Sequence, residues 1–526
     1  MQKQNHNMRT ERKSSIKNSA TRLILIALLV LIQTGWMIVL MSKLNTYSTA
    51  ITLTMTCIAV IIALKVFGTH VNSAQRMPWL IVITAVPFFG ICIYLLFGRS
   101  IVTKGMRRRF NGIEADILKN KLKQDEKIIK ELEQKDLGIA NQCRYISNTA
   151  KYPVYKNTDM EYYNTALESF EAQLWELSKA EKFIFMEYHA IEDAISFERL
   201  KKVLIDKAKN GVEVRIFYDD LGSIFFLNKE FIKRMRDEGI QCRVFNPLKV
   251  IVNMFMNNRD HRKITVIDGK VGFTGGYNLA DEYFNITHPY GYWKDTGVKL
   301  TGDAVKSLTA SFLTMWNAID HTDSQEAYDE YIDATDGTYN AASQECYVQP
   351  YSDNPLGHDR IGEDVYLNIL KNAKHYVYIT TPYLIITDEM ERELRLAVKR
   401  GVDVRIVTPG IPDKKMVYKI TRSYYEPLCS AGVRIYEYTP GFCHAKQWVA
   451  DDEVCVVGTI NMDFRSLYLH FENAVFTYNR ELAGKVKADM LNNFEISNEV
   501  TSDYAVDVIR PLKLGTCMLH MISPLL

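Results

Sequence analysis

The chain has 526 residues, of which 47% are hydrophobic and 24% are charged. This composition is ordinary for a globular protein, and the length is sufficient for two or more domains. The formal net charge of +2 gives no support to a nucleic-acid-binding protein, because such proteins usually carry a strongly basic balance.

The N-terminal region, residues 1–109, predicts a helical membrane part with two or three transmembrane helices. The stretch 23–41 has no charged residue over 19 positions, and another 22 uncharged positions lie between Arg76 and Arg99. Each stretch is long enough to cross the hydrocarbon core of a bilayer. A shorter, threonine-rich apolar stretch between them either crosses the membrane or lies at its surface. The expected helices lie at about 22–42, 49–67 and 77–98.

Lysines and arginines flank this region on both sides, before residue 23 and at 99–109. The positive-inside rule places both flanks in the cytoplasm, which two transmembrane helices satisfy and three do not. We expect a multi-pass protein of the cell membrane whose remaining residues lie on the cytoplasmic side. The basic cluster at 99–109 would also attract anionic lipid headgroups, by about 1 kcal/mol for each basic residue.

Residues 110–144 are charged and have a helical pattern, which predicts a linker helix. From residue 145 onwards, apolar segments of strand length alternate with segments of helical pattern. This alternation indicates an α/β fold with a mostly parallel sheet and helices on both faces.

The alternating part is an internal repeat. The segment "NGVEVRIFYDD" recurs 190 residues later as "RGVDVRIVTPG", and its neighbouring strands recur in the same order. A steady offset of this kind predicts two duplicated α-β-α domains, at 145–335 and 336–526. We expect them to pack with pseudo-two-fold symmetry.

Each half contains one copy of the pattern His-x-Lys-x4-Asp. The copies are His261, Lys263 and Asp268, and, 183 residues further on, His444, Lys446 and Asp451. Residues i and i+2 of a strand share one face, so the histidine and the lysine of each copy project together. Histidine can act as a nucleophile or carry a proton near neutral pH, and a lysine ammonium suits a phosphate oxygen.

The aspartate of each copy is expected to support the site and not to react. Asp268 is followed by Gly269 between two apolar runs, which indicates a hairpin turn, and Asp451 also lies in a turn-like sequence. Each aspartate follows the lysine by an odd number of residues, so in a regular strand it would face away from the pocket.

The repeat continues beyond the motif with a glycine and an asparagine in each half. These residues are Gly275 and Asn278 in "GGYN", and Gly458 and Asn461 in "GTIN". Glycine would let the backbone approach a ligand, and the asparagine amide could donate to an oxyanion.

Two carboxylates follow on apolar stretches, Asp295 in "YWKDTGVKL" and Glu472 in "HFENAVF". A catalytic histidine needs an acceptor for its second nitrogen, so each carboxylate is a candidate to orient the histidine of its own half. The alternative is that both are solvated strand carboxylates.

Two histidines, two lysines and two asparagines around one pocket would suit a phosphodiester. One histidine would attack phosphorus, and the other would protonate the leaving alcohol and then deprotonate the incoming one. No cofactor and no metal is expected, because the lysines supply positive charge and the sequence shows no metal-ligand spacing and no glycine-rich nucleotide loop. Cys443, beside His444, is expected to be a small buried hydrophobe and not a ligand or nucleophile.

These residues resemble the phospholipase D superfamily, whose signature is the duplicated His-x-Lys-x4-Asp motif. Within it, the chain is most similar to the bacterial cardiolipin synthase family. That similarity includes "PWLIVITAVPFFGICIYLLFG", "YWKDTGVKL" and the terminal "SPLL". The threonine-rich apolar segment departs from the family's commoner two-span pattern, and "GGYN" and "GTIN" depart from its frequent Gly-Ser form.

The resemblance implies a phosphatidyltransferase that joins two phosphatidylglycerol molecules into cardiolipin and releases glycerol. It implies His261 as the nucleophile, His444 as the acid, and a membrane with phosphatidylglycerol and other anionic phospholipids as partners, without nucleic acid. One alternative is a phospholipase D-type enzyme that hydrolyses its substrate. Another is a membrane scaffold without activity, which two intact motifs disfavour.

Overall fold

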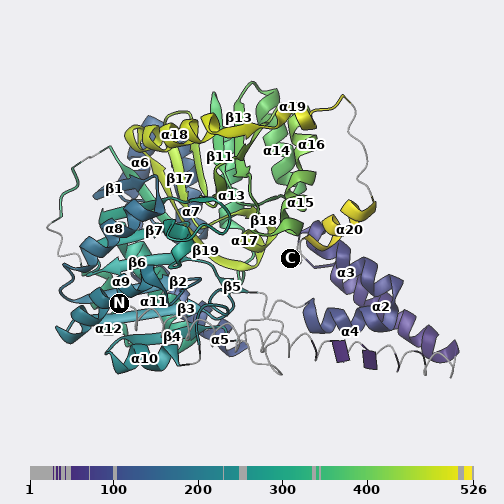
Figure 1. The fold of residues 1–526 in the computed structure, drawn as a ribbon, viewed down its shortest axis with the longest axis horizontal. Coiled ribbons are helices and arrows are strands. Elements are labelled where there is room, and N and C mark those ends of the chain that lie inside the picture. The colour runs from purple at the N-terminus through teal and green to yellow at the C-terminus, as the bar shows by residue number, and fades with distance from the viewer. Residues whose placement is uncertain are drawn as a thin grey trace. The chain divides into compact units, whose positions relative to one another are not determined.

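A computed structural model describes residues 49–69, 72–98, 104–228, 230–247, 258–334, 339–342, 345–507 and 514–523, with isolated positions between 28 and 42. The chain divides into two compact units, whose elements are labelled in Figure 1. The smaller contains Met1–Val102, Pro247–Asn258 and Leu512–Leu526, and the larger contains Thr103–Asn246 and Arg259–Pro511.

The smaller unit is helical. Its described helices are α2 (Thr49–Phe67), α3 (Ser73–Ala85), α4 (Pro87–Phe97) and α20 (Leu514–Ile522). Helix α2 coincides with the helix predicted at 49–67. The helix predicted at 77–98 is divided at Val86, because Pro87 lacks the N–H that would continue the preceding helix.

The expected membrane crossing is not confirmed by these helices. Within the described residues, none of them combines the length and the apolar character that a transmembrane helix requires. The helix predicted at 22–42 lies largely outside the described residues. Helices α2, α3 and α4 share a small apolar core of Ala59, Ala63, Val66, Ile83 and Ile91.

The larger unit begins with three helices where the sequence predicted one linker helix. They are α5 (Lys104–Asn120), α6 (Glu126–Lys135) and α7 (Leu137–Thr149). The side chains of Asp125 and Asp136 cap α6 and α7, so they begin new helices inside the predicted one. Helix α5 packs on α11 (Val305–Ile319) and α7 packs on α13 (Ile361–Asn372).

Two sheets with the same strand order form the centre of the larger unit, one in each half. The first has the order β1-β9-β7-β6-β2-β3-β4, and the second has the order β10-β19-β17-β16-β11-β13-β14-β20. The first contains β1 (Thr158–Tyr163), β2 (Phe183–Tyr188), β3 (Glu213–Asp219), β4 (Gln241–Phe245), β6 (Lys263–Ile267), β7 (Val271–Gly275) and β9 (Gly297–Gly302). The second contains β10 (Tyr347–Asp353), β11 (Tyr376–Thr380), β13 (Asp403–Pro409), β14 (Arg434–Tyr438), β16 (Gln447–Ala450), β17 (Val454–Gly458), β19 (His470–Tyr478) and β20 (Ser497–Glu499).

The sheets are mixed, whereas the sequence predicted mostly parallel ones. Strands β2, β3 and β4 run parallel, as do β11, β13 and β14. Strands β6, β7 and β9 are antiparallel neighbours, and so are β16, β17 and β19. The motif hairpins account for the pairs β6–β7 and β16–β17, because a turn of a few residues can join antiparallel strands but not parallel ones.

Helices from each half bind the two halves together. Helix α11 contacts β10 of the second half, and α18 (Arg480–Glu495) contacts β1 of the first. Short strands do the same: β5 (Arg259–Asp260) pairs with β19, and β8 (Tyr292–Lys294) pairs with β15 (Gly441–Cys443).

Other helices of this unit are α8 (Ala166–Leu177), α9 (Ile195–Lys209), α10 (Phe231–Asp237), α12 (Gln325–Ile332), α14 (Asp388–Lys399), α15 (Lys415–Ser423), α16 (Tyr425–Ala431), α17 (Phe464–Tyr468) and α19 (Thr501–Tyr504).

Candidate active site

Two short pairs of parallel strands cross between the halves beside the motif histidines. In one, Asp260 of β5 lies opposite Phe471 of β19. In the other, Cys443 of β15 lies opposite Lys294 of β8. Each pair ends one residue before a motif histidine on one strand and one residue before a predicted orienting carboxylate on the other.

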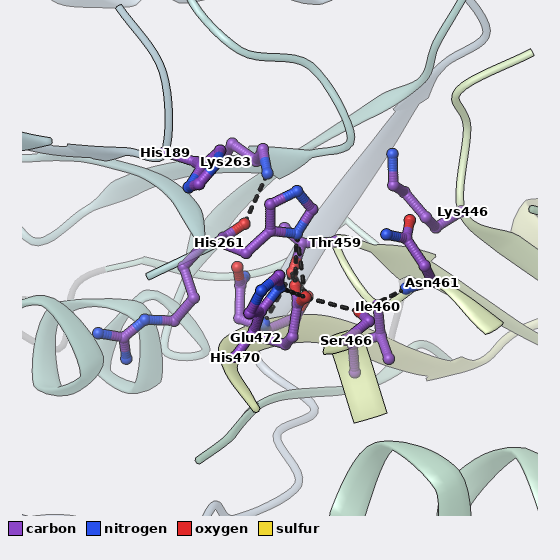
Figure 2. A network of polar contacts seen from close by, with 12 residues as sticks. His189, His261, Lys263, Lys446, Thr459, Ile460, Asn461, Ser466, His470 and Glu472 are labelled. Atoms are coloured by element: carbon purple, nitrogen blue, oxygen red, sulfur yellow. Dashed lines mark hydrogen bonds and ion pairs between the residues drawn. The ribbon is translucent and has the colours of Figure 1, made fainter. Parts of the chain in front are cut away.

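This register places each histidine beside the carboxylate of the other half. Nδ1 of His261 lies 3.0 Å from both carboxylate oxygens of Glu472, and Nδ1 of His444 lies 2.6 Å from Oδ2 of Asp295. Figure 2 shows the first of these pairs. The two carboxylates were predicted, but their assignment to the histidine of their own half is wrong. The strand pairs between the halves determine which carboxylate each histidine contacts. No local pattern in the sequence reveals these strand pairs.

Both histidines are buried, with 8% of His261 and 6% of His444 exposed. Burial, reinforced by the charges of Lys263 and Lys446, lowers the pKa of His261 well below its ordinary value. Burial and Lys446 lower the pKa of His444 to about 3. Each ring is therefore neutral at neutral pH. With its proton on Nδ1, directed at the carboxylate, each ring keeps a lone pair on Nε2.

The motif lysines lie next to these rings. The Lys263 ammonium donates to the carbonyl oxygen of His261 at 2.6 Å. The Lys446 ammonium donates to the carbonyl oxygen of His444 and lies 2.9 Å from Nε2 of its ring, whose lone pair can accept from it. In Figure 2 the ends of the two lysine side chains flank the upper end of the His261 ring, Lys263 to its left and Lys446 to its right. Burial lowers the pKa of Lys263 to about 7 and the pKa of Lys446 to about 8.

The motif aspartates lie at the far ends of the hairpins. Asp268 follows β6 and Asp451 follows β16, each with a φ of 53°. The Asp268 carboxylate accepts hydrogen bonds from the backbone N–H groups of residues 181–183 at 2.7–2.8 Å. The Asp451 carboxylate accepts from residues 374–376 at 2.7–2.9 Å. Each aspartate thus ties its hairpin to the start of the neighbouring strand, the supporting position that the sequence indicated.

The two predicted glycines pack closely against neighbouring strands. A Cβ atom on Gly275 would lie 2.8 Å from the Cα of Gly297, and one on Gly458 would lie 2.5 Å from the Cα of Ala474. Both neighbours belong to the chain segment that follows an orienting carboxylate. A side chain at either glycine would therefore displace the segment that holds Asp295 or Glu472 in place.

The two predicted asparagines differ in their contacts. The amide nitrogen of Asn278 donates to the Tyr283 hydroxyl at 2.7 Å, and its oxygen accepts from the N–H of Ala190 at 3.1 Å. The side-chain oxygen of Asn461 is buried without a hydrogen-bond partner. Donation from Asn278 to a substrate oxygen would therefore require it to exchange its bond with Tyr283.

The two carboxylates are held by different neighbours, which the sequence reasoning missed. Glu472 accepts hydrogen bonds from the hydroxyls of Thr459 and Ser466, the latter at 2.6 Å. Asp295 instead packs against Gly276, where a Cβ atom would clash with its carboxylate. Thr459 and Gly276 occupy the same position in "GTIN" and "GGYN", so this difference was visible in the sequence. Ser466 lies in α17, and no local pattern in the sequence marks it as a hydrogen-bond partner of Glu472.

The histidines also differ in their aromatic surroundings. His261 packs against the imidazole rings of His189 and His470, at centroid distances of 5.0 and 5.5 Å. His444 packs among larger rings at 5.3–5.8 Å. These rings belong to Tyr283, Trp293 and Phe442. The first pocket is therefore polar and the second is apolar.

One group beside the site has the composition of a metal centre. Within the part of the chain that the structure describes, ligand atoms of His261, His470 and Glu472 lie within 4.8 Å of one another. Nδ1 of His261 already points at the Glu472 carboxylate, so an ion there would displace that hydrogen bond. The lysine pair supplies positive charge to the pocket without such an ion.

Comparison with known proteins identifies the family. Residues 174–316 and 366–493, which contain His261 and His444, match a family described as cardiolipin synthase, PLD-like domain. A cardiolipin synthase of Clostridium perfringens is 33% identical over 457 residues, which cover 86% of this chain and 95% of that protein. The chain belongs to the cardiolipin synthase family. Residues 53–99 match a phospholipase D–nuclease N-terminal family.

Two further relatives and one solved structure are also similar to the chain. A cardiolipin synthase of Alkalihalophilus pseudofirmus is 31% identical over 497 residues, covering 94% of this chain and 95% of the relative. An uncharacterized protein of Streptococcus mutans is 39% identical over 465 residues, covering 88% and 99%. A crystal structure of phosphatidylserine synthase from Haemophilus influenzae has a TM-score of 0.53 at 15% identity, covering 69% of this chain and 93% of that one, and this shows a shared fold.

Proposed function

We propose that this enzyme is a cardiolipin synthase that transfers the phosphatidyl group of one phosphatidylglycerol to another, releasing glycerol. The observation that carries the proposal is the pair of buried neutral histidines, each held by a carboxylate from the opposite half. Family membership supports the substrate, because several relatives with the same duplicated domain are named cardiolipin synthase.

In the first step, Nε2 of His261 attacks the phosphorus of the donor. A nitrogen–phosphorus bond forms, the bond to the glycerol oxygen breaks, and that oxygen takes a proton from His444. Glu472 keeps the lone pair of His261 on Nε2 by accepting a hydrogen bond from Nδ1–H. An anionic phosphodiester offsets the charges of Lys263 and Lys446, so substrate binding raises the pKa of His444 and allows it to carry that proton.

In the second step, neutral His444 removes the proton from a hydroxyl group of the second phosphatidylglycerol. That oxygen attacks phosphorus, the nitrogen–phosphorus bond breaks, and His261 is restored. The lysine ammoniums and the asparagine amides stabilise the oxygens of both transition states. One phosphodiester replaces another, so the reaction needs no nucleotide, and we assign it no metal.

We further propose that residues 1–109 attach the enzyme to the cell membrane as a multi-pass anchor, with the domains at 145–335 and 336–526 on the cytoplasmic side. Support comes from the uncharged stretches of the sequence, the basic flanks and the N-terminal family match. Protease digestion of sealed and inverted membrane vesicles would test the side: the two domains should be cleaved only in inverted vesicles.

The decisive test is the product formed by the purified full chain with phosphatidylglycerol in mixed micelles. Cardiolipin and glycerol should appear in equal amounts, and activity should survive a metal chelator. Phosphatidic acid as the sole lipid product would assign the chain to the hydrolytic alternative. A loss of activity in chelator that one divalent ion restores would contradict the metal-free mechanism.

A further inference from the structure

The segment 411–419, between β13 and the middle of α15, combines exposed apolar and basic side chains. Ile411 is 41% exposed and Met416 is 49% exposed. Lys414, Lys415 and Lys419 are exposed beside them. The segment has one acidic residue, and its carboxylate accepts a hydrogen bond from the Tyr383 hydroxyl at 2.6 Å. The outward charge of the segment is therefore positive.

Contacts place this segment at the rim of the active site. The Lys414 ammonium lies 5.4 Å from the centroid of the Tyr383 ring. That ring lies 6.4 Å from Phe442, which in turn packs 5.8 Å from His444. Burial and the charges of nearer groups are the larger causes of the lowered pKa of His261, and the charge of Lys414 also contributes to it. The segment therefore borders the space between the two histidines.

The equivalent loop of the first half presents a similar side chain. Strands β3 and β13 hold the same place in their sheets, and the loop after β3 carries Phe225, which is 49% exposed. This loop reaches the site through Gly222, where a Cβ atom would lie 2.7 Å from Nε2 of His189. The carboxyl ends of parallel strands are where α/β sheets bind their ligands.

We propose that segment 411–419 and the loop around Phe225 form a docking surface for an anionic lipid bilayer, here called the rim surface. Apolar side chains between lysines fit a membrane interface, because the former enter the acyl boundary while the latter meet headgroup phosphates. A soluble phosphate would engage the lysines but leave Ile411 and Met416 without a role. The inference rests on the proposed function, which makes the bilayer the source of the substrate.

Lipid contact can be measured without turnover. The full chain is reconstituted in nanodiscs of phosphatidylglycerol and phosphatidylcholine that contain a lipid with a nitroxide on its acyl chain. Exposed Cys57 and Cys517 are replaced by serine, and Met416→Cys carries an environment-sensitive fluorophore. The nitroxide should quench this fluorophore at least twofold more strongly than one at the control position.

Leu396→Cys is the matched control, because Leu396 is 41% exposed near the end of α14, which runs back from the site towards the opposite edge of the sheet. Equal quenching at both positions would overturn the proposal. A fluorophore at Met416 that is shielded from water but not quenched would also overturn it, and would assign the surface to a protein partner. Because quenching needs no turnover, failure of cardiolipin synthesis leaves this result intact.

A second measurement separates docking from chemistry. Lys415→Gln with Lys419→Gln should lower kcat/KM on bilayer phosphatidylglycerol by about fivefold for each lysine, or about 25-fold in all. Activity on monomeric short-chain phosphatidylglycerol should stay unchanged, and salt should remove the difference on bilayers. Equal loss on both substrates, or no loss on either, would contradict the proposal. Lys414 is left intact because its charge reaches His261.

Discussion

At the residue scale, the two copies of one motif place their histidines in unlike settings. Glu472 is held by two hydroxyl groups, whereas Asp295 has Gly276 beside it and no room for a side chain there. The Glu472 side chain is one methylene longer than that of Asp295. The residue that packs against each carboxylate differs as well: Thr459 beside Glu472 and Gly276 beside Asp295. The two halves are related in fold but their site residues are not interchangeable.

This asymmetry predicts losses of unequal size for two small substitutions. Gly276→Ala should lower turnover by at least 100-fold, because its methyl group must move Asp295 away from His444. Thr459→Ala should lower turnover by about tenfold, since one hydrogen bond to a charged acceptor is worth about 1.5 kcal/mol. Steady-state kinetics with thermal unfolding of both variants would check this. Similar losses in the two variants would mean that the packing at Asp295 does not matter.

The crossed pairing predicts distinct roles for the two carboxylates. With a donor lipid that has a nitrophenol leaving group, which needs no acid, the first step depends on His261 but not on His444. Glu472→Gln should slow formation of the phosphoenzyme by about 10²–10⁴-fold, by loss of the orienting acceptor. Asp295→Asn should form it at a near-normal rate and then accumulate it. Rapid quenching with labelled donor measures both rates, and pairing within each half would exchange the two results.

At the scale of elements, the hairpin after each motif is fastened by one aspartate. Each carboxylate holds three backbone N–H groups at the start of the neighbouring strand, β2 or β11. Both aspartates also adopt a left-handed conformation, which aspartate and asparagine tolerate better than most residues. These contacts and this conformation explain why both copies of the motif have an aspartate at this position.

Asp268→Ala should accordingly reduce stability more than chemistry. We expect a loss of about 2 kcal/mol in the free energy of unfolding, because three backbone donors lose a charged acceptor. Asp268→Asn should lose less, since asparagine keeps one acceptor and tolerates the same φ. Urea unfolding and kcat at low temperature would separate the two quantities. A folded Asp268→Ala protein with kcat lowered 100-fold would instead show that the carboxylate takes part in the reaction.

The sequence predicted local features well and long-range ones poorly. The motif spacing identified His261 and Lys263 as neighbours, although His261 lies between β5 and β6 and not within a strand. The repeat revealed both halves, because such patterns are written in neighbouring residues. The partner of each histidine depends on the pairing of β5 with β19 and of β8 with β15, which join segments about 150–210 residues apart. Asp125 and Asp136 are residues that favour the start of a helix, but the charged pattern around them predicts one continuous helix.

At the scale of the whole molecule, the charge of the pocket comes from both halves at once. Burial lowers the pKa of Lys263 to about 7 and of Lys446 to about 8, so both ammoniums lose protons as pH rises through this range. Because kcat/KM reports the free enzyme, it should fall above about pH 7 as Lys263 loses its proton, and more steeply above about pH 8 as Lys446 does. Lys446→Arg stays protonated and should remove the steeper fall above about pH 8, whatever its maximal rate. An unchanged limb would mean that lysine protonation does not control binding.

The same lysines link stability to pH. In the unfolded chain their pKa is about 10.4, so between about pH 7 and 10 the unfolded state binds more protons than the folded state. The free energy of unfolding should therefore rise with pH in this window. Lys446→Met should flatten part of that rise and stabilise the protein at pH 7, because it removes a buried cation. Denaturant titrations at several pH values would measure both effects.

The pairing between the halves also has a consequence for the growing chain. His261 leaves the ribosome 211 residues before the glutamate that orients it. At about 5–20 residues per second, this interval lasts roughly 10–40 seconds. During that time the nascent first half holds a histidine and a lysine but no oriented nucleophile. The unfinished enzyme is therefore latent, and its reactivity towards phospholipids begins when the last strands of the second half are in place.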